Sequence, residues 1–154
     1  LIGAEASDLN RIKPILDDTG KRTVHFGPVG SGTVYKLMHN LLGAVHIAAA
    51  AELVAVACKA GLDGATVAET FSIGANASAS GLMTMPGMIS GNHNEGIHFT
   101  TALRAKDASY ALAMAREFGM TVPVGQAAAN IFETATKDGL GDLAQSAVIE
   151  TLKS

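Results

Sequence analysis

The sequence predicts an all-α domain, a helical bundle around one long central helix, preceded by a short βαβ segment. Three observations favour this fold. The 154 residues fit one domain with a sizeable core. Hydrophobic residues make up 48% of the chain but aromatic residues only 5%, so alanine and aliphatic side chains must fill that core, and alanine is the best helix former. Residues 33–60 follow a helical pattern without a proline.

The first 27 residues differ from the rest, because they predict a strand, a helix and a second strand. LIGAE is a short apolar run, and TVHFG alternates like a strand. SDLNRIKPIL has apolar residues at helical spacing, and Pro14 is expected to kink this helix or to mark a second helix start. This order is typical of the last unit of an α/β domain. The chain also opens without a methionine, so we expect residues 1–27 to end a domain that begins upstream, and residues 28–154 to form the helical domain.

The helices of the second domain follow from apolar spacing and from the residues that end each run. The pattern from Ser31 or Thr33 to Ala60 predicts one helix of roughly 40–45 Å that Gly61 caps. This helix is apolar around most of its circumference, so we expect several neighbours to bury it. A shorter helix should follow with Asp63 or Thr66 as its N-cap, then a broken helix and loop rich in Gly, Ser and Asn. Further helices are expected at 100–118, from Pro123, and from about residue 145 to the end.

Charge and cysteine content limit the kinds of partner. A formal net charge of -3 and a pI near 5.9 argue against a nucleic-acid surface. No apolar run of about 18 residues is free of charge, so we expect no membrane span. The single cysteine, Cys58, lies in a helical pattern, where a buried free thiol is expected, and this favours a reducing, cytoplasmic setting. The histidines lack a metal-ligand spacing, so no metal site is expected.

The segment GPVGSGTVYKLMHN, residues 27–40, allows three interpretations. A dinucleotide-binding loop needs G-x-G-x-x-G, whereas the glycines here are spaced G-x-x-G-x-G and a long helix follows. The glycines could simply turn the chain into the helix. That interpretation leaves Lys36 and Asn40 unexplained, because at i and i+4 they share one helix face with apolar flanks.

The third interpretation is a catalytic helix. A lysine among apolar neighbours can have its pKa lowered by desolvation, which suits proton transfer near neutral pH. An asparagine one turn later can donate a hydrogen bond to a substrate oxygen or accept one from a hydroxyl. The residues alone leave a catalytic pair and a solvated polar pair both open.

The motif G-P-V-G-S-G-x-x-x-K-x-x-x-N resembles the interdomain segment of the β-hydroxyacid dehydrogenases, which include 3-hydroxyisobutyrate and 6-phosphogluconate dehydrogenases. The resemblance implies that Lys36 is the catalytic acid/base and that Asn40 binds substrate. The family usually has two adjacent asparagines after the lysine, and here the first is His39. This departure concerns the details of hydrogen bonding to the substrate.

Two further segments carry the same resemblance. FTTALRAKDASYALAMAREFGMTVP is similar to the family's F-x-x-x-L-x-x-K-D segment, which implies that Lys106 lies near the nicotinamide end of the cofactor and Phe99 near the substrate. GLGDLAQSAV is similar to the family's closing G-x-G-D-x-D-x-S-A, with Ala144 in place of the second acid. Together the matches run from about residue 13 to 149.

The resemblance implies the C-terminal domain of an NAD- or NADP-dependent oxidoreductase acting on a small 3-hydroxy acid. The short helical domain favours the 3-hydroxyisobutyrate branch of the family. The missing N-terminal Rossmann domain would bind most of the cofactor, so we expect the chain alone to be inactive. Family members associate through this domain, which implies a homo-oligomer. The alternative is a non-catalytic helical oligomerisation or interaction module derived from the family.

Overall fold

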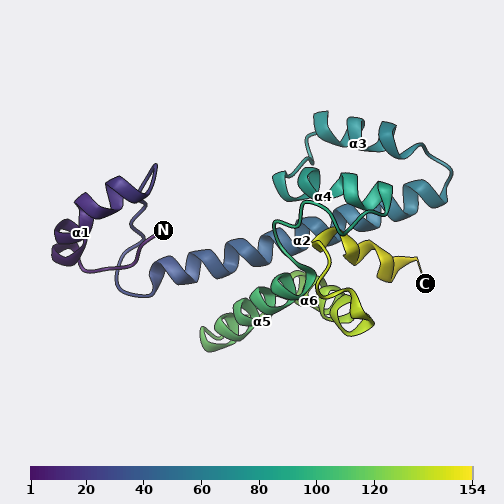
Figure 1. The fold of residues 1–154 in the computed structure, drawn as a ribbon. Helices are drawn as coiled ribbons and strands as arrows, with labels where there is room; N and C mark the ends of the chain where they lie inside the picture. Colours follow the sequence, from purple (N-terminus) through teal and green to yellow (C-terminus); the bar gives the residue numbers. More distant parts are fainter. Residues whose placement is uncertain (154) are drawn as a thin grey trace. The chain divides into compact units, whose positions relative to one another are not determined.

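The structure is a computed structural model that describes residues 1–153, and these residues are mostly helical (Figure 1). The all-α prediction is confirmed. The chain divides into two compact units, Leu1–His39 and Asn40–Ser154. The division falls inside the longest helix, α2 (Ser31–Lys59), which therefore contributes to both units. The division of the protein into domains at residue 27 stays a prediction.

The smaller unit contains helix α1 (Ala6–Thr19), and Pro14 lies inside it. The two strands predicted on either side reduce to a single parallel bridge between Ile2 and His25. Three backbone hydrogen bonds of 2.8–2.9 Å hold these segments together: Ile2 N–H to Val24 O, Phe26 N–H to Ile2 O and Ala4 N–H to Gly27 O. Two short segments that pair only with each other are too few for a sheet, so the strand–helix–strand order is present with only this minimal pairing.

Helix α2 begins at Ser31, one of the two predicted starts, and ends one residue before the predicted end. Gly61 has a φ of 85°, in the left-handed region that favours glycine, and its N–H bonds to Cys58 O at 3.0 Å. The glycine cap is therefore confirmed. The prediction of a buried Cys58 is wrong, because its side chain is exposed. The preceding residue, Ala57, is buried, and Cys58, one position further along the helix, lies on the side that faces solvent.

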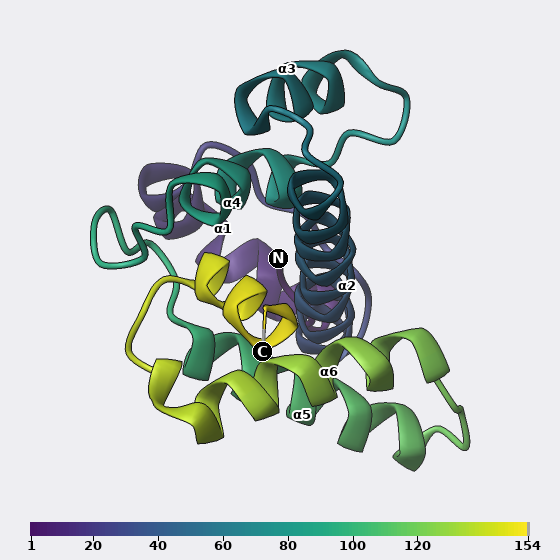
Figure 2. The same cartoon turned by 90° about the vertical axis from the view of Figure 1, so that its right-hand side faces the viewer.

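The larger unit adds four α-helices and two shorter helical segments to α2 (Figure 2). Helices α5 and α6 lie side by side in both views. The stretch rich in Gly, Ser and Asn ends in a loop, as predicted, but the helix before that loop is not broken and continues through Pro86. The terminal helix is present as a 3₁₀-helix. The bounds are α3 Gly64–Ile73, α4 Ala79–Ser90, α5 Thr101–Glu117, α6 Pro123–Ala135, the π-helical turn η1 Thr136–Leu140 and the 3₁₀-helix η2 Gln145–Leu152.

The core of the larger unit consists mainly of alanine and aliphatic side chains, with Phe132 as its buried aromatic ring. Small residues let the helices approach closely. A Cβ atom at Gly125 of α6 would lie 2.7 Å from Leu41 Cδ2 of α2, so only glycine fits at this contact. Core members from α2 are Leu41, Ala44, Ile47, Ala48, Ala51 and Val54.

Helix α2 is long and apolar enough to cross a membrane, judged by length and composition alone. The core helix of a soluble protein has the same two properties, and one side of α2 carries the core residues of the larger unit. Helix α2 therefore contributes one side to the core of the larger unit.

Candidate active site

The larger unit brings Asn40 of α2 against Asp107 of α5. The Asn40 side-chain Nδ2 donates to Asp107 Oδ2 at 2.6 Å, and a hydrogen bond to a carboxylate is stronger than one between neutral groups. Both side chains are partly buried. A carboxylate accepts and cannot donate, so this contact fixes which way the Asn40 amide faces.

Lys106 completes this cluster on α5. Its Nζ lies 3.2 Å from Asp107 Oδ1, while its side chain is 49% exposed and its ammonium lies 5.8 Å from the centre of the Tyr110 ring. One oxygen of Asp107 thus accepts a hydrogen bond from Asn40, and the other forms an ion pair with Lys106. Asp107 therefore joins two predicted site residues, Asn40 and Lys106. No role was predicted for Asp107 from the sequence, although it directly follows Lys106.

Arg104 lies beneath this cluster and is only 8% exposed. Its Nη1 donates to the backbone oxygen of Asn40 at 2.9 Å, and its Nε donates to Gln145 Oε1 at 2.9 Å. Burial lowers the pKa of the Arg104 guanidinium, and the negative charge of Asp107 opposes that shift. Arginine remains protonated in proteins, so Arg104 is a buried cation. The helical pattern of α5 gave no signal for it.

The chain makes room for this cation on α2. A Cβ atom at Gly43 would lie 3.1 Å from Arg104 Nη1, closer than most real contacts, so the glycine leaves space for the guanidinium against the helix. Arg104 therefore ties α5 to α2 at Asn40 and to the start of η2 at Gln145.

Phe99 lies just before α5, and its ring covers the Arg104 guanidinium, with 4.5 Å between Cζ and the ring centre. Such a contact of a buried cation with an aromatic face is favourable. The Phe99 backbone oxygen accepts from Gln145 N–H at 3.1 Å. Phe99, Asn40 and Lys106 are thus connected through Arg104 and Asp107 within the larger unit.

Lys36 belongs to the smaller unit and lies one turn before Asn40 on α2. Its side chain is exposed, so its apolar flanking residues do not bury it. Nearby in the same unit, Tyr35 stacks between two rings, with centre-to-centre distances of 4.5 Å to Phe26 and 5.7 Å to His39. Stacking on Tyr35 is thus the structural role of His39, which stands where the family has asparagine.

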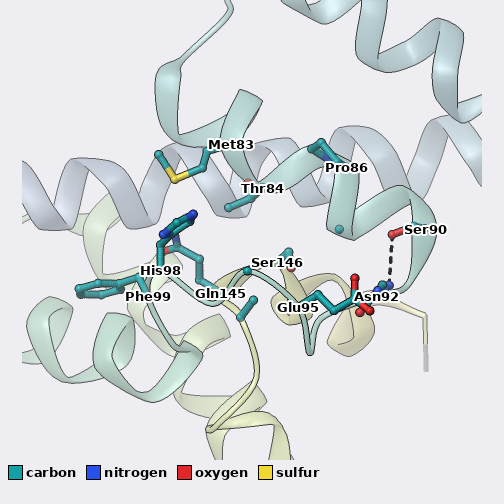
Figure 3. A pocket seen from close by; sticks show the side chains of 13 residues that line it. Met83, Thr84, Pro86, Ser90, Asn92, Glu95, His98, Phe99, Gln145 and Ser146 are labelled. Carbon is teal, nitrogen blue, oxygen red and sulfur yellow. Dashed lines mark hydrogen bonds between the residues drawn. The ribbon is translucent and has the colours of Figure 1, made fainter.

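A pocket of about 380 Å³ opens beside Phe99 in the larger unit (Figure 3). Residues of α4, of the loop before α5 and of the start of η2 line it. The lining residues are Met83, Thr84, Pro86, Gly87, Ser90, Asn92, Glu95, Gly96, His98, Phe99, Ala144, Gln145 and Ser146.

Behind the pocket wall lies a buried histidine that sequence reasoning did not single out. His93 Nδ1 is 2.9 Å from Ser146 Oγ, and His93 Nε2 is 3.0 Å from Glu150 Oε1. Glu150 also accepts from Lys153 Nζ at 2.8 Å. This cluster joins the loop after α4 to η2. Among residues 1–153, no group of three or more His, Cys, Asp or Glu is arranged to hold a metal ion.

Comparisons with known proteins show the family of this chain. Residues 30–152 match the family model described as NAD-binding of NADP-dependent 3-hydroxyisobutyrate dehydrogenase. A probable 3-hydroxyisobutyrate dehydrogenase of Mycobacterium bovis is 31% identical over 160 residues, which cover 100% of this chain and 54% of that protein. A 2-(hydroxymethyl)glutarate dehydrogenase of Eubacterium barkeri is 32% identical over 151 residues, which cover 97% of this chain and 50% of that protein.

A solved structure is similar as well. The crystal structure of 3-hydroxyisobutyrate dehydrogenase from Salmonella typhimurium superposes with a TM-score of 0.87 at 29% identity, covering 97% of this chain and 52% of that one. The chain therefore spans about half the length of the relatives that it matches.

Proposed function

The chain belongs to the 3-hydroxyisobutyrate dehydrogenase family of β-hydroxyacid dehydrogenases, and from this premise we propose that the whole protein oxidises a small 3-hydroxy acid with NAD or NADP. The reverse reaction would reduce the matching semialdehyde. The observation that carries the proposal is the contact of Asn40 with Asp107 beside Lys106. It joins, through one carboxylate, two residues that come from separate family motifs.

Lys36 is the acid/base in this proposal. Oxidation removes a hydride from the carbinol carbon and a proton from its hydroxyl, and the amine of Lys36 takes that proton. NAD or NADP, when bound, supplies the hydride acceptor. The exposed position of Lys36 leaves the side chain accessible to a substrate, and such acid/base catalysis contributes about 10²–10⁴-fold to rate.

Asn40 holds the substrate one helical turn away. Its amide nitrogen donates to Asp107, so this carboxylate orients the amide for its contact with the substrate. Lys106 is partly exposed and cationic, which fits a role beside the carboxylate of the substrate or the cofactor. The sequence contains no G-x-G-x-x-G loop, so most of the contacts with the cofactor would come from outside this chain.

The test of this proposal is Lys36→Ala in the full-length protein. We expect kcat with the preferred 3-hydroxy acid to fall by about 10²-fold or more, with the circular dichroism spectrum unchanged. Lys59→Ala is a matched control, because Lys59 ends the same helix far from Asn40. Turnover of Lys36→Ala within a few-fold of wild type would remove Lys36 from the acid/base role.

A further inference from the structure

The pocket beside Phe99 contains one hydrogen-bond donor whose direction the fold sets. Gln145 is only 6% exposed, and its Oε1 accepts from Arg104 Nε at 2.9 Å. Arginine has no acceptor, so the Gln145 oxygen must face Arg104 and the amide nitrogen must face away from it. The backbone of Gln145 is held as well, because its N–H donates to Phe99 O at 3.1 Å.

The Gln145 nitrogen Nε2 donates to no residue that the structure describes. Among residues 1–153, every fully buried side-chain nitrogen or oxygen has a hydrogen-bond partner. Nε2 therefore reaches open space, and the space that Gln145 lines is this pocket. A buried amide presents an aligned N–H₂ group to a cavity, with a buried cation directly behind it.

The two ends of the pocket differ in charge. In Figure 3, Gln145 and Phe99 lie at one end, and Glu95 and Asn92 lie at the other. The donor of Gln145 and the charge of Arg104 favour an acceptor or an anion at the first end, whereas the Glu95 carboxylate disfavours an anion at the second. His98 also lines the pocket.

We propose that this pocket receives the end of the substrate remote from the reacting carbinol, and that Gln145 selects 3-hydroxy acids whose remote end carries a hydrogen-bond acceptor, above all a second carboxylate. Phe99 lines the pocket and covers Arg104, and Arg104 donates to the backbone of Asn40, so the pocket adjoins the residues assigned to the substrate. A site built to bind a polar group rejects analogues that lack it, because its donor is then left without a partner. The inference rests on the proposed function.

The experiment compares two substrates of the same size with the full-length protein. One is 2-(hydroxymethyl)glutarate, and the other is its apolar isostere, in which an isopropyl group replaces the remote carboxylate. We expect kcat/KM to favour the diacid at least about tenfold. Gln145→Glu keeps an oxygen toward Arg104 but replaces the donor with a second acceptor, so the preference should disappear or reverse. Glu133→Gln, at an exposed residue of α6 that does not line this pocket, should leave the preference intact.

Glutarate separates a failure of this inference from a failure of the proposed function, because it has no hydroxyl and cannot be oxidised. In titration calorimetry, glutarate should bind the wild-type protein and bind Gln145→Glu at least about tenfold more weakly. If no 3-hydroxy acid is turned over, the proposed function fails, and the glutarate titration alone decides on the pocket. Turnover without preference between the two substrates, or glutarate binding equal in both proteins, would overturn the inference.

Discussion

The Asn40 amide shows how one hydrogen bond decides the chemistry that a side chain offers. Its nitrogen donates to Asp107 at 2.6 Å, and this bond holds the amide in one orientation beside Lys106. In the full-length protein we expect Asn40→Ala to raise the substrate dissociation constant about 5- to 150-fold, because leaving a substrate group without its hydrogen-bond partner costs about 1–3 kcal/mol. The dissociation constant for NAD or NADP should stay close to wild type.

Asn40→Asp is the sharper variant, because it places a second carboxylate against Asp107 and should weaken substrate binding more than Asn40→Ala does. Both constants can be measured by calorimetry with an inert substrate analogue. Asn130→Ala is a matched control, because Asn130 is an asparagine of α6 whose side chain accepts an exposed hydrogen bond from Gln126. A loss confined to nucleotide binding would contradict the assignment of Asn40 to the substrate.

Glu150 makes stability depend on pH. Burial alone would raise the pKa of its carboxyl, but hydrogen bonds from Lys153 and His93 outweigh burial and hold the pKa below its ordinary value. A carboxylate whose pKa is lowered by folding stabilises the fold above its unfolded pKa, and that stabilisation is lost as the pH falls below about 4.3. We expect Glu150→Gln to be less stable than wild type at neutral pH and to lose less stability on acidification.

Urea unfolding at neutral and acidic pH measures this difference. Glu133→Gln is the control, since Glu133 forms an exposed ion pair with Lys137 on the surface, and such pairs contribute little. Equal acid sensitivity of Glu150→Gln and wild type would show that the His93–Glu150–Lys153 cluster does not couple folding to pH.

The residues that sequence reasoning found and those it missed differ in a physical way. Lys36, Asn40, Phe99 and Lys106 stand in spaced motifs along the chain. The role of Arg104 depends on contacts with residues 41 and 64 positions away, and no local pattern on α5 announces such a contact. Its partner Gln145 was unpredictable for the same reason.

At the scale of the element, a helix was predictable wherever the helical spacing of apolar residues ended at a capping residue. Helix α2 has an unbroken apolar pattern and a glycine at its end, and its bounds were predicted within two residues. The N-terminal strands were not, because a strand is stabilised by its partners and the described residues supply only the bridge of Ile2 with His25. The exposure of Cys58 also depends on which neighbours cover each side of α2.

The contact of α6 with α2 yields a prediction about packing. A Cβ atom at Gly125 would lie 2.7 Å from Leu41 Cδ2, and Leu41 is buried and has little room to move. Overpacking of this kind costs about 1–3 kcal/mol, so we expect Gly125→Ala to lower the free energy of unfolding by about that amount. Urea denaturation followed by circular dichroism measures it.

Gly141→Ala is the matched control for this packing test. A Cβ atom there would meet its neighbours at ordinary distances of 3.4 and 3.5 Å, and the backbone φ of -59° suits alanine. It should be neutral or slightly stabilising. Equal effects of the two substitutions would show that α6 does not approach α2 as closely as the structure places it.

At the scale of the whole molecule, apolar side chains of α2 and α3 remain uncovered. Val56 is 70% exposed and Ile73 is 83% exposed, and Leu53 and Leu62 are also exposed. Leu53, Leu62 and Phe71 help to line an apolar cavity of about 500 Å³ at the same helices. Large exposed apolar patches mark interaction sites, and the interfaces of obligate homodimers resemble a divided core.

We therefore expect this 154-residue chain to form a dimer or higher oligomer in solution through the surface of α2 and α3. It should bind neither NAD nor NADP detectably, because its sequence has no glycine-rich phosphate loop of the dinucleotide-binding type. Sedimentation equilibrium at micromolar concentration measures the first property and calorimetric titration with each nucleotide the second. Val56→Glu should dissociate the oligomer by burying a charge at the interface, whereas Glu117→Gln, on α5, should not. A stable wild-type monomer would refute the association, and tight nucleotide binding would place the cofactor contacts within this chain.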